Sequence, residues 1–206
     1  MAGRLSRARK APPGSPDAED GGLDEQDDPE SVARLICLRL LTAAPRTQAE
    51  LAAALQRRGV PDDAAAAVLA RFAEVKLIDD AMFARAWVES RHHSRGLAGR
   101  ALSAELRRRG VAPEHIASAL DELDPGQEAE TARELVTRRL PGTRGQPGPA
   151  RMRRLTGVLA RKGYPAGLAY RVVREALEQE AAEAGRSAYY LADMQEPDGD
   201  DEACDL

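Results

Sequence analysis

Pairs of basic residues stand directly before three glycines, and they are the residues of this chain best suited to binding a charged ligand. The pairs are Arg57-Arg58 before Gly59, Arg108-Arg109 before Gly110 and Arg161-Lys162 before Gly163. Arginine forms bidentate hydrogen bonds with phosphate or carboxylate groups. A structural role is the competing interpretation, because the helix dipole alone favours basic residues at the end of a helix.

Further arginines extend this pattern. Arg100 and Arg107 are seven residues apart, which places them on one face of a helix, and Arg153 stands ten residues before its glycine, as Arg100 does. If the three segments align in register, these groups follow one side of the molecule as a continuous cationic track. Such a track suits a nucleic-acid backbone or a helical protein filament. The candidate contact residues are Arg57, Arg58, Arg91, Arg95, Arg100, Arg107, Arg108, Arg109, Arg151, Arg153, Arg154, Arg161 and Lys162.

The sequence predicts no catalytic or metal site. It contains no glycine-rich phosphate loop, no paired-cysteine zinc pattern and no nucleophile elbow. His92 and His93 are adjacent, so on a helix they point about 100° apart and make a poor chelate. His115 is solitary, and a surface or interfacial role is the simpler interpretation for all three. We therefore expect a protein that is not an enzyme and needs no cofactor.

A helix-turn-helix repressor is the main competing DNA-binding architecture. In that motif the second helix enters the major groove and reads bases through its N-terminal part. Here the equivalent helices carry Glu114, Asp121 and Glu122 in one segment and begin with Asp62-Asp63 in another. Phosphate would repel these carboxylates, so the sequence favours backbone contacts from the preceding helices over base reading.

A repeated leucine pattern sets the positions of the basic pairs. The three glycines are 51 and 53 residues apart, a period typical of helical solenoids. Leucine stands eight and four residues before each of them: Leu51 and Leu55, Leu102 and Leu106, Leu155 and Leu159. Glycine ends a helix where the chain enters the left-handed region, so each block supplies the second and third helices of a repeat.

We therefore predict an all-α fold, an elongated curved array of three tandem three-helix repeats with disordered tails. The tails are rich in acidic residues and cannot bury enough apolar surface to offset ordering entropy. The predicted boundaries are a tail at residues 1–29, repeats at 30–76, 77–124 and 125–180, a flexible Pro/Gly connector at 141–149 within the third repeat, and a tail at 181–206.

Several residues are assigned to structural roles. Thr47 and Glu50 form a capping-box pattern at the start of a helix, and an aspartate of the Asp79-Asp80 pair can cap the next repeat's first helix. Phe83 and Trp87 are expected in the core and not as platforms for stacked bases.

Charge is distributed unevenly along the chain. The formal net charge is −4, but residues 31–180 carry 25 basic and 18 acidic side chains, a net charge of +7. Residues 1–30 carry a net charge of −4, and residues 181–206 a net charge of −7. A basic body thus lies between acidic tails, and the body alone suits a negatively charged partner.

The sequence also bears on cellular location. The chain has no run of about 18 apolar residues that could span a membrane, and the N-terminus lacks the apolar segment of a secretory signal. Of two cysteines, Cys37 lies in an apolar helix and Cys204 in the acidic tail, so a disulfide framework is not expected. We expect a cytoplasmic protein that does not contact membranes.

Residues 77–111, LIDDAMFARAWVESRHHSRGLAGRALSAELRRRGV, resemble the central signature of the RecX family. In that family an Asp-Asp-x-x-Phe-Ala helix is followed by a basic Ser-Arg segment and a Glu-Leu-Arg-x-Lys/Arg-Gly-Val/Ile block. The closing LARKGYPAGLAYRVV is similar to the family's last repeat, and the resemblance covers about residues 30–180. The tails lie outside the pattern. The wealth of arginine and alanine suggests a GC-rich bacterium such as an actinobacterium.

The resemblance implies a regulator of the RecA recombinase in DNA repair and the SOS response, and we expect the protein to be a monomer. Members of the family are elongated helical arrays that lie in the groove of the RecA–single-stranded DNA filament. Inhibition of strand exchange, of ATP turnover and of co-protease action is the expected effect. Two alternatives remain: a stand-alone DNA-binding helical module without sequence specificity, and a helical scaffold for another protein.

Overall fold

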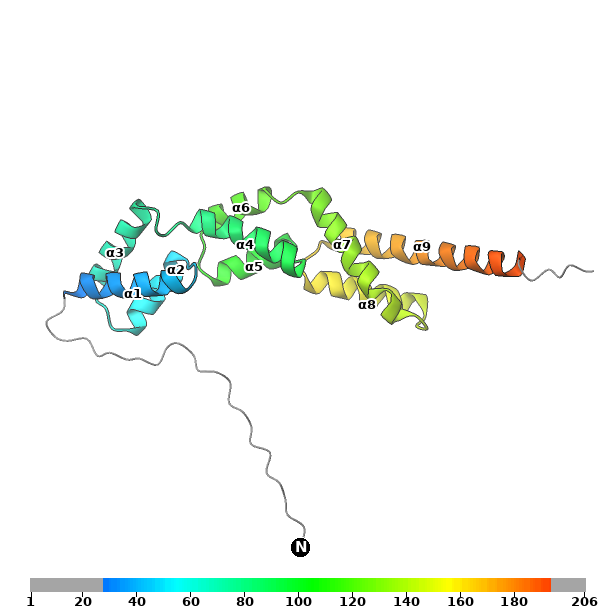
Figure 1. Cartoon of the computed structure of the whole chain (residues 1–206), viewed down its shortest axis with the longest axis horizontal. Coiled ribbons are helices and arrows are strands. Elements are labelled where there is room, and N and C mark those ends of the chain that lie inside the picture. Colours follow the sequence, from blue (N-terminus) through cyan, green and yellow to red (C-terminus); the bar gives the residue numbers. More distant parts are fainter. Residues whose placement is uncertain (1–27, 194–206) are drawn as a thin grey trace, which may run out of the picture.

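The computed structural model describes residues 28–193, with side chains described as far as residue 185. Within this part of the chain, regular structure consists of nine α-helices and one 3-10 turn. Three helical units follow one another along the long axis in a shallow arc (Figure 1). The predicted array of three tandem three-helix repeats is confirmed. The predicted disorder of residues 1–27 and 194–206 falls outside the described residues.

The first unit buries its core between the first helix and the other two. Its elements are α1 (Pro29–Ala43), α2 (Gln48–Arg57) and α3 (Asp62–Glu74). Cys37 is fully buried there beside Leu51, Leu55 and Phe72, as a small hydrophobic residue should be.

The other two units have the same design. In each, the first and second helices both pack against the third. The second unit contains α4 (Asp80–Arg95), α5 (Gly99–Arg108) and α6 (Pro113–Asp121), and the third contains α7 (Pro125–Arg139), the 3-10 turn η1 (Pro141–Thr143), α8 (Gly148–Arg161) and α9 (Ala166–Asp193). The leucines that stand eight and four residues before each glycine are all buried in the cores of their units.

The glycine between the second and third helices adopts the left-handed conformation in every unit. The φ angle is +73° at Gly59, +77° at Gly110 and +91° at Gly163. Residues with a Cβ are strained in this region, which explains why glycine occupies all three positions. The turn reverses the chain so that the third helix packs back on the second.

Two predicted helix caps are present. The Thr47 side chain accepts a hydrogen bond from the Glu50 amide, and the Glu50 carboxylate accepts one from the Thr47 amide, which completes the capping box. Asp79 accepts a hydrogen bond from the Met82 amide at 2.9 Å, and this bond lowers the pKa of Asp79.

Two predictions about the third unit are wrong. Residues 141–149 are not a flexible connector without contacts of their own, because the Thr143 hydroxyl is buried, donates to the Leu140 carbonyl and accepts from Arg151. The last helix does not end near Glu180 but continues to Asp193, so residues 181–193 are helical. The alanine-rich stretch at 181–184 explains the extension, since alanine is the strongest helix former.

Candidate nucleic-acid and filament interface

Neighbouring units join where a glycine turn docks on the first turn of the preceding unit's second helix. At the first joint, a Cβ added to Gly110 would overlap the side chain of Ala49. The Thr47 hydroxyl donates to the carbonyl of Arg109 at 2.6 Å, and the Gln48 amide donates to Asp80 at 2.9 Å. The N-terminal amides and cap of α2 are therefore satisfied partly by the second unit.

The second joint repeats this arrangement. A Cβ added to Gly163 would lie 2.8 Å from the Cβ of Ala101 and closer still to its backbone nitrogen. The Ala98 amide donates to the carbonyl of Lys162 at 2.8 Å, and the Gly99 amide donates to Glu128 at 3.0 Å. Both joints thus pair a glycine turn with the first turn of a second helix, although the side chains that make the hydrogen bonds differ.

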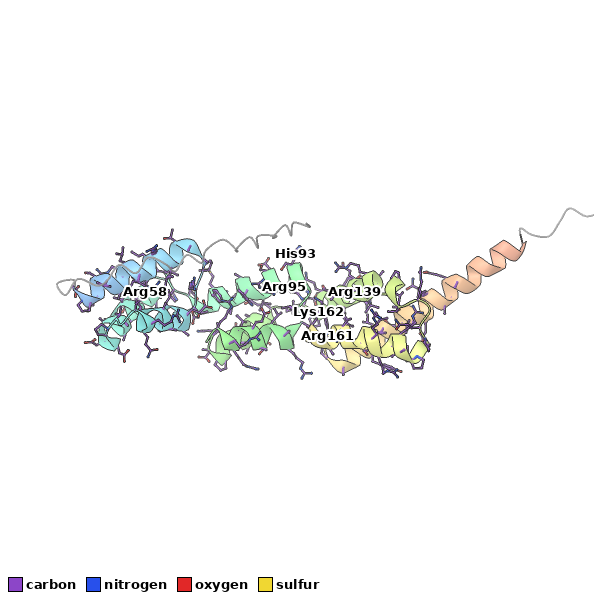
Figure 2. The ribbon with its side chains drawn as sticks, turned by 90° about the horizontal axis from the view of Figure 1, so that it is seen from below. Arg58, His93, Arg95, Arg139, Arg161 and Lys162 are labelled. Carbon is purple, nitrogen blue, oxygen red and sulfur yellow. The ribbon has the colours of Figure 1, made fainter. Side chains whose placement is uncertain are left out.

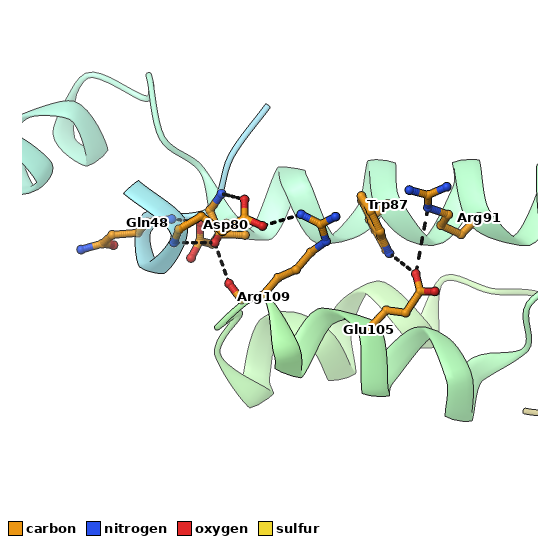
Figure 3. A network of polar contacts seen from close by, with 8 residues as sticks. Gln48, Asp80, Trp87, Arg91, Glu105 and Arg109 are labelled. Carbon is orange, nitrogen blue, oxygen red and sulfur yellow. Dashed lines mark hydrogen bonds and ion pairs between the residues drawn. The ribbon is translucent and has the colours of Figure 1, made fainter. Parts of the chain in front are cut away.

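Two of the predicted contact arginines are held around a tryptophan near the first joint (Figure 3). The guanidinium carbons of Arg91 and Arg109 lie 4.1 Å and 3.9 Å from the centre of the Trp87 ring. Arg109 also pairs with Glu50 across the joint, while Glu105 accepts from the Trp87 indole at 3.0 Å. These arginines stabilise the chain itself, and Trp87 packs between them as expected of a structural residue.

Two further predicted contacts have partners within the chain. Arg151 is mostly buried and pairs with Glu180, whose pKa is lowered by its hydrogen bonds from Arg151 and Arg144. Lys162 donates through Nζ to the carbonyl of Arg95, which ties the third unit to the end of α4. We therefore leave Arg91, Arg109, Arg151 and Lys162 out of the proposed set of direct contacts.

The other nine predicted contact residues remain available on the surface. All are exposed, and none makes an ion pair with another residue described by the structure. They are Arg57, Arg58, Arg95, Arg100, Arg107, Arg108, Arg153, Arg154 and Arg161. All but Arg95 lie on the second helix of a unit or at its C-terminal end, as the repeat pattern requires. Whether they form one continuous track stays a prediction.

A cleft of about 690 Å³ at the second joint gathers further basic residues. Its lining includes Arg95 and His93 from α4, Arg138 and Arg139 from α7, and Lys162. Figure 2 shows Arg95, Arg139 and Lys162 where the second and third units meet. The glycine-centred repeat pattern does not single out Arg138 and Arg139, although this basic pair stands at a helix end like the pairs before the glycines.

The charges of this cleft are not balanced internally. Burial, together with the charges of Arg139, Arg138 and Arg95, lowers the pKa of Lys162. Of the two carboxylates in the lining, Glu130 is paired with Arg133 at 2.8 Å, which leaves Glu134. An anionic group entering the cleft would therefore meet an excess of positive charge.

The cleft at the first joint differs in character. It encloses about 830 Å³ and is lined by apolar residues together with Lys76, Arg85, Asp79 and Asp80. Arg85 pairs with Glu122 at 3.3 Å, and both aspartates accept hydrogen bonds from helix N-terminal amides. Only the second of these two clefts presents unpaired guanidinium groups among the described residues.

The three histidines lie in different environments. His92 is buried, with Nδ1 at 2.9 Å from the carbonyl oxygen of Leu97 and Nε2 at 3.1 Å from the Thr131 hydroxyl of the third unit. This confirms an interfacial role. His93 is exposed and lines the basic cleft, and His115 is half-buried at the first joint's cleft.

The fold defines a helical-repeat protein, with exposed basic side chains on or at the end of its second helices. Family models for the first, second and third three-helix domains of RecX match residues 33–72, 79–120 and 127–173. A relative from Thermobifida fusca, named Regulatory protein RecX, is 56% identical over 183 residues, covering 89% of this chain and 95% of the relative. A Streptomyces coelicolor relative of the same name is 55% identical over 187 residues, covering 86% and 97%. The chain belongs to the RecX family.

Solved structures show the same fold. The crystal structure of a regulatory protein RecX aligns with a TM-score of 0.66 at 23% identity, over 72% of each chain. RecX from Lactobacillus salivarius aligns with a TM-score of 0.68 at 16% identity, over 71% of this chain and 96% of that one. Over residues 28–193, no helix has the length and apolar character needed to cross a membrane.

Proposed function

We propose that this protein binds the RecA–single-stranded DNA filament and inhibits its recombinase, ATPase and co-protease activities. The observation that carries the proposal is the 56% identity to a protein named Regulatory protein RecX, which extends over nearly the full length of both chains. On this proposal the protein is a monomeric, cytoplasmic regulator without catalytic activity of its own.

The geometry supports this function in two ways. An elongated array offers one long surface to a filament, whereas a compact domain of similar size would contact only a short part of it. The unpaired guanidinium groups on the second helices and in the second-joint cleft suit phosphate groups, which accept bidentate hydrogen bonds from arginine.

The direct test is RecA ATPase activity on single-stranded DNA in the presence of substoichiometric protein. Inhibition is expected, and unchanged ATP turnover would count against the proposal. Charge reversal of Arg107 and Arg108 to glutamate should weaken inhibition while helicity stays intact, because both side chains are exposed at the end of α5. The matched control reverses Arg34 and Arg39, two exposed arginines of α1 outside the candidate set.

A stand-alone DNA-binding role is the second candidate, and the unbalanced charge of the second-joint cleft favours it. It predicts tight binding to single-stranded DNA without RecA, with an affinity that falls steeply as salt rises. The two functions separate cleanly, because a stand-alone DNA binder would lower RecA activity only by competing for DNA. Its effect would then disappear when DNA is in excess.

A further inference from the structure

The turn around Gly59 has the same geometry as the two turns that dock between units. Its φ of +73° matches that of Gly110, and a basic pair precedes both glycines. A Cβ added to Gly59 would nevertheless meet no atom within 4 Å, whereas one added to Gly110 or Gly163 would overlap the preceding unit. The first unit therefore carries a turn of the docking type whose glycine has open space where the other two glycines meet a helix.

The two occupied turns show what such a turn binds. Each meets a small residue in the first turn of a helix, Ala49 at the first joint and Ala101 at the second. In each, the carbonyl just before the glycine accepts a hydrogen bond, from the Thr47 hydroxyl or from the Ala98 amide. The corresponding carbonyl of Arg58 accepts none from the residues that the structure describes.

The basic residue directly before each glycine indicates what kind of helix can dock on the Gly59 turn. Arg109, directly before Gly110, pairs with Glu50 in the first turn of α2. Lys162 holds the same position at the second joint, where the first turn of α5 has no acidic residue, and it donates instead to a backbone carbonyl. Arg58 is the third equivalent and is exposed without an ion pair among the described residues. It can pair with an acidic residue in the helix that docks on its turn.

We propose that the Gly59 turn docks on the first turn of a helix in the protein component of the filament. That helix should carry a small residue and a glutamate or aspartate in its first turn, as α2 does. The proposal rests on the proposed function and adds to it the chemistry of one contact. It assigns this end of the array to protein and not to DNA.

The second helices of another copy of this chain do not fit as the occupant. The first turns of α2 and α5 are already occupied within the chain. The remaining second helix, α8, begins at Gly148 and has Arg151, Arg153 and Arg154 in its N-terminal half, with no acidic residue in its first turn. These cations would face Arg57 and Arg58 of the other copy, and like charges repel.

The experiment compares Gly59→Asn with Gly145→Asn in the full chain. Asparagine tolerates the left-handed region better than other residues with a Cβ, and both glycines have positive φ and open space around them. Gly59→Asn places a side chain where the partner helix would lie. It should raise the protein concentration needed for half-inhibition of RecA ATPase by about tenfold, while Gly145→Asn should match the unmodified protein. Neither substitution should change binding to single-stranded DNA alone.

Arg58→Glu gives a second, surface-only variant that tests the charge. It should weaken inhibition, whereas Arg58→Lys should keep most of it. Inhibition by Gly59→Asn equal to that of the unmodified protein would overturn this contact and leave the proposed function standing. A loss of DNA binding in the same variant would also overturn it, because the turn would then contact nucleic acid. Failure of the unmodified protein to inhibit RecA would reject the proposed function itself.

Discussion

Replacing Arg138 and Arg139 by glutamine should weaken binding to single-stranded DNA in a way that depends on salt. Both residues are exposed in the second-joint cleft and make no ion pair with described side chains. If each contacts one phosphate, each releases about 0.7 of a counterion from a single strand on binding. The slope of log affinity against log salt should therefore decrease in magnitude by about 1.4 when both are replaced.

The same relation gives the size of the effect at a fixed salt concentration. At about 0.1 M monovalent salt, a slope change of about 1.4 corresponds to roughly a 25-fold loss of affinity. The loss should shrink as salt rises, and it should vanish as the concentration approaches about 1 M. A general loss of folding would not follow this course, because an unfolded fraction lowers the apparent affinity at every salt concentration.

The assay is fluorescence anisotropy of a labelled oligonucleotide titrated with the full chain across a salt series. The control replaces Arg34 and Arg39 of α1 by glutamine, which removes the same charge from the first unit, and its slope should equal that of the unmodified protein. Identical slopes for the cleft variant and the unmodified protein would refute the assignment of phosphate contacts to this cleft.

Three further outcomes are expected. Gly110→Ala and Gly59→Ala should each lower the free energy of unfolding by about 1–2 kcal/mol, because alanine is strained in the left-handed region. Gly110→Ala should lose about 1–3 kcal/mol more, because its methyl group overlaps the preceding unit. Equal losses for the two variants in chemical denaturation would contradict the close contact of Gly110 with the first unit. Arg109→Ala should destabilise the fold by about 2 kcal/mol and shift the emission of Trp87, the single tryptophan, to longer wavelength, since the ring loses cover on one face. The folded-state pKa of Glu180 lies below its ordinary value of 4.5, so its paired carboxylate stabilises the folded state above that pH, and this contribution is lost as the pH falls through the lowered value. Glu180→Gln should remove that part of the acid sensitivity, measured by melting temperature between about pH 3 and 6.

The sequence predicts the repeat well because its determinants are local. The leucine spacing, the left-handed glycines and the Thr47 capping box each act within one helix and the adjoining turn. The same reasoning could not decide which arginines are available to a ligand. The partner of Arg109 is Glu50, 59 residues away in the sequence, and only the joint brings the two together.

The third unit shows where extrapolation from repeats fails. The predicted connector contains proline and glycine, which indicate a loop, yet the buried Thr143 hydroxyl and the Arg151–Glu180 pair fix it in place. Those contacts depend on α9, whose extension to Asp193 has no counterpart in the other units. Arg138 and Arg139 lie outside the repeat pattern because that pattern is centred on glycines, and no glycine ends α7.

At both joints, residues of the later unit bond the helix of the earlier unit. Amides in the first turn of α2 are bonded by the second unit, and those of α5 by the third, so these two helices depend on residues that come later in the chain. During synthesis on the ribosome, the first and second units can therefore complete their hydrogen bonding only after the next unit has emerged. Shortening the chain from its C-terminal end would uncover the first turn of α5, whereas removing the first unit would leave the amides of α5 and of the units after it bonded.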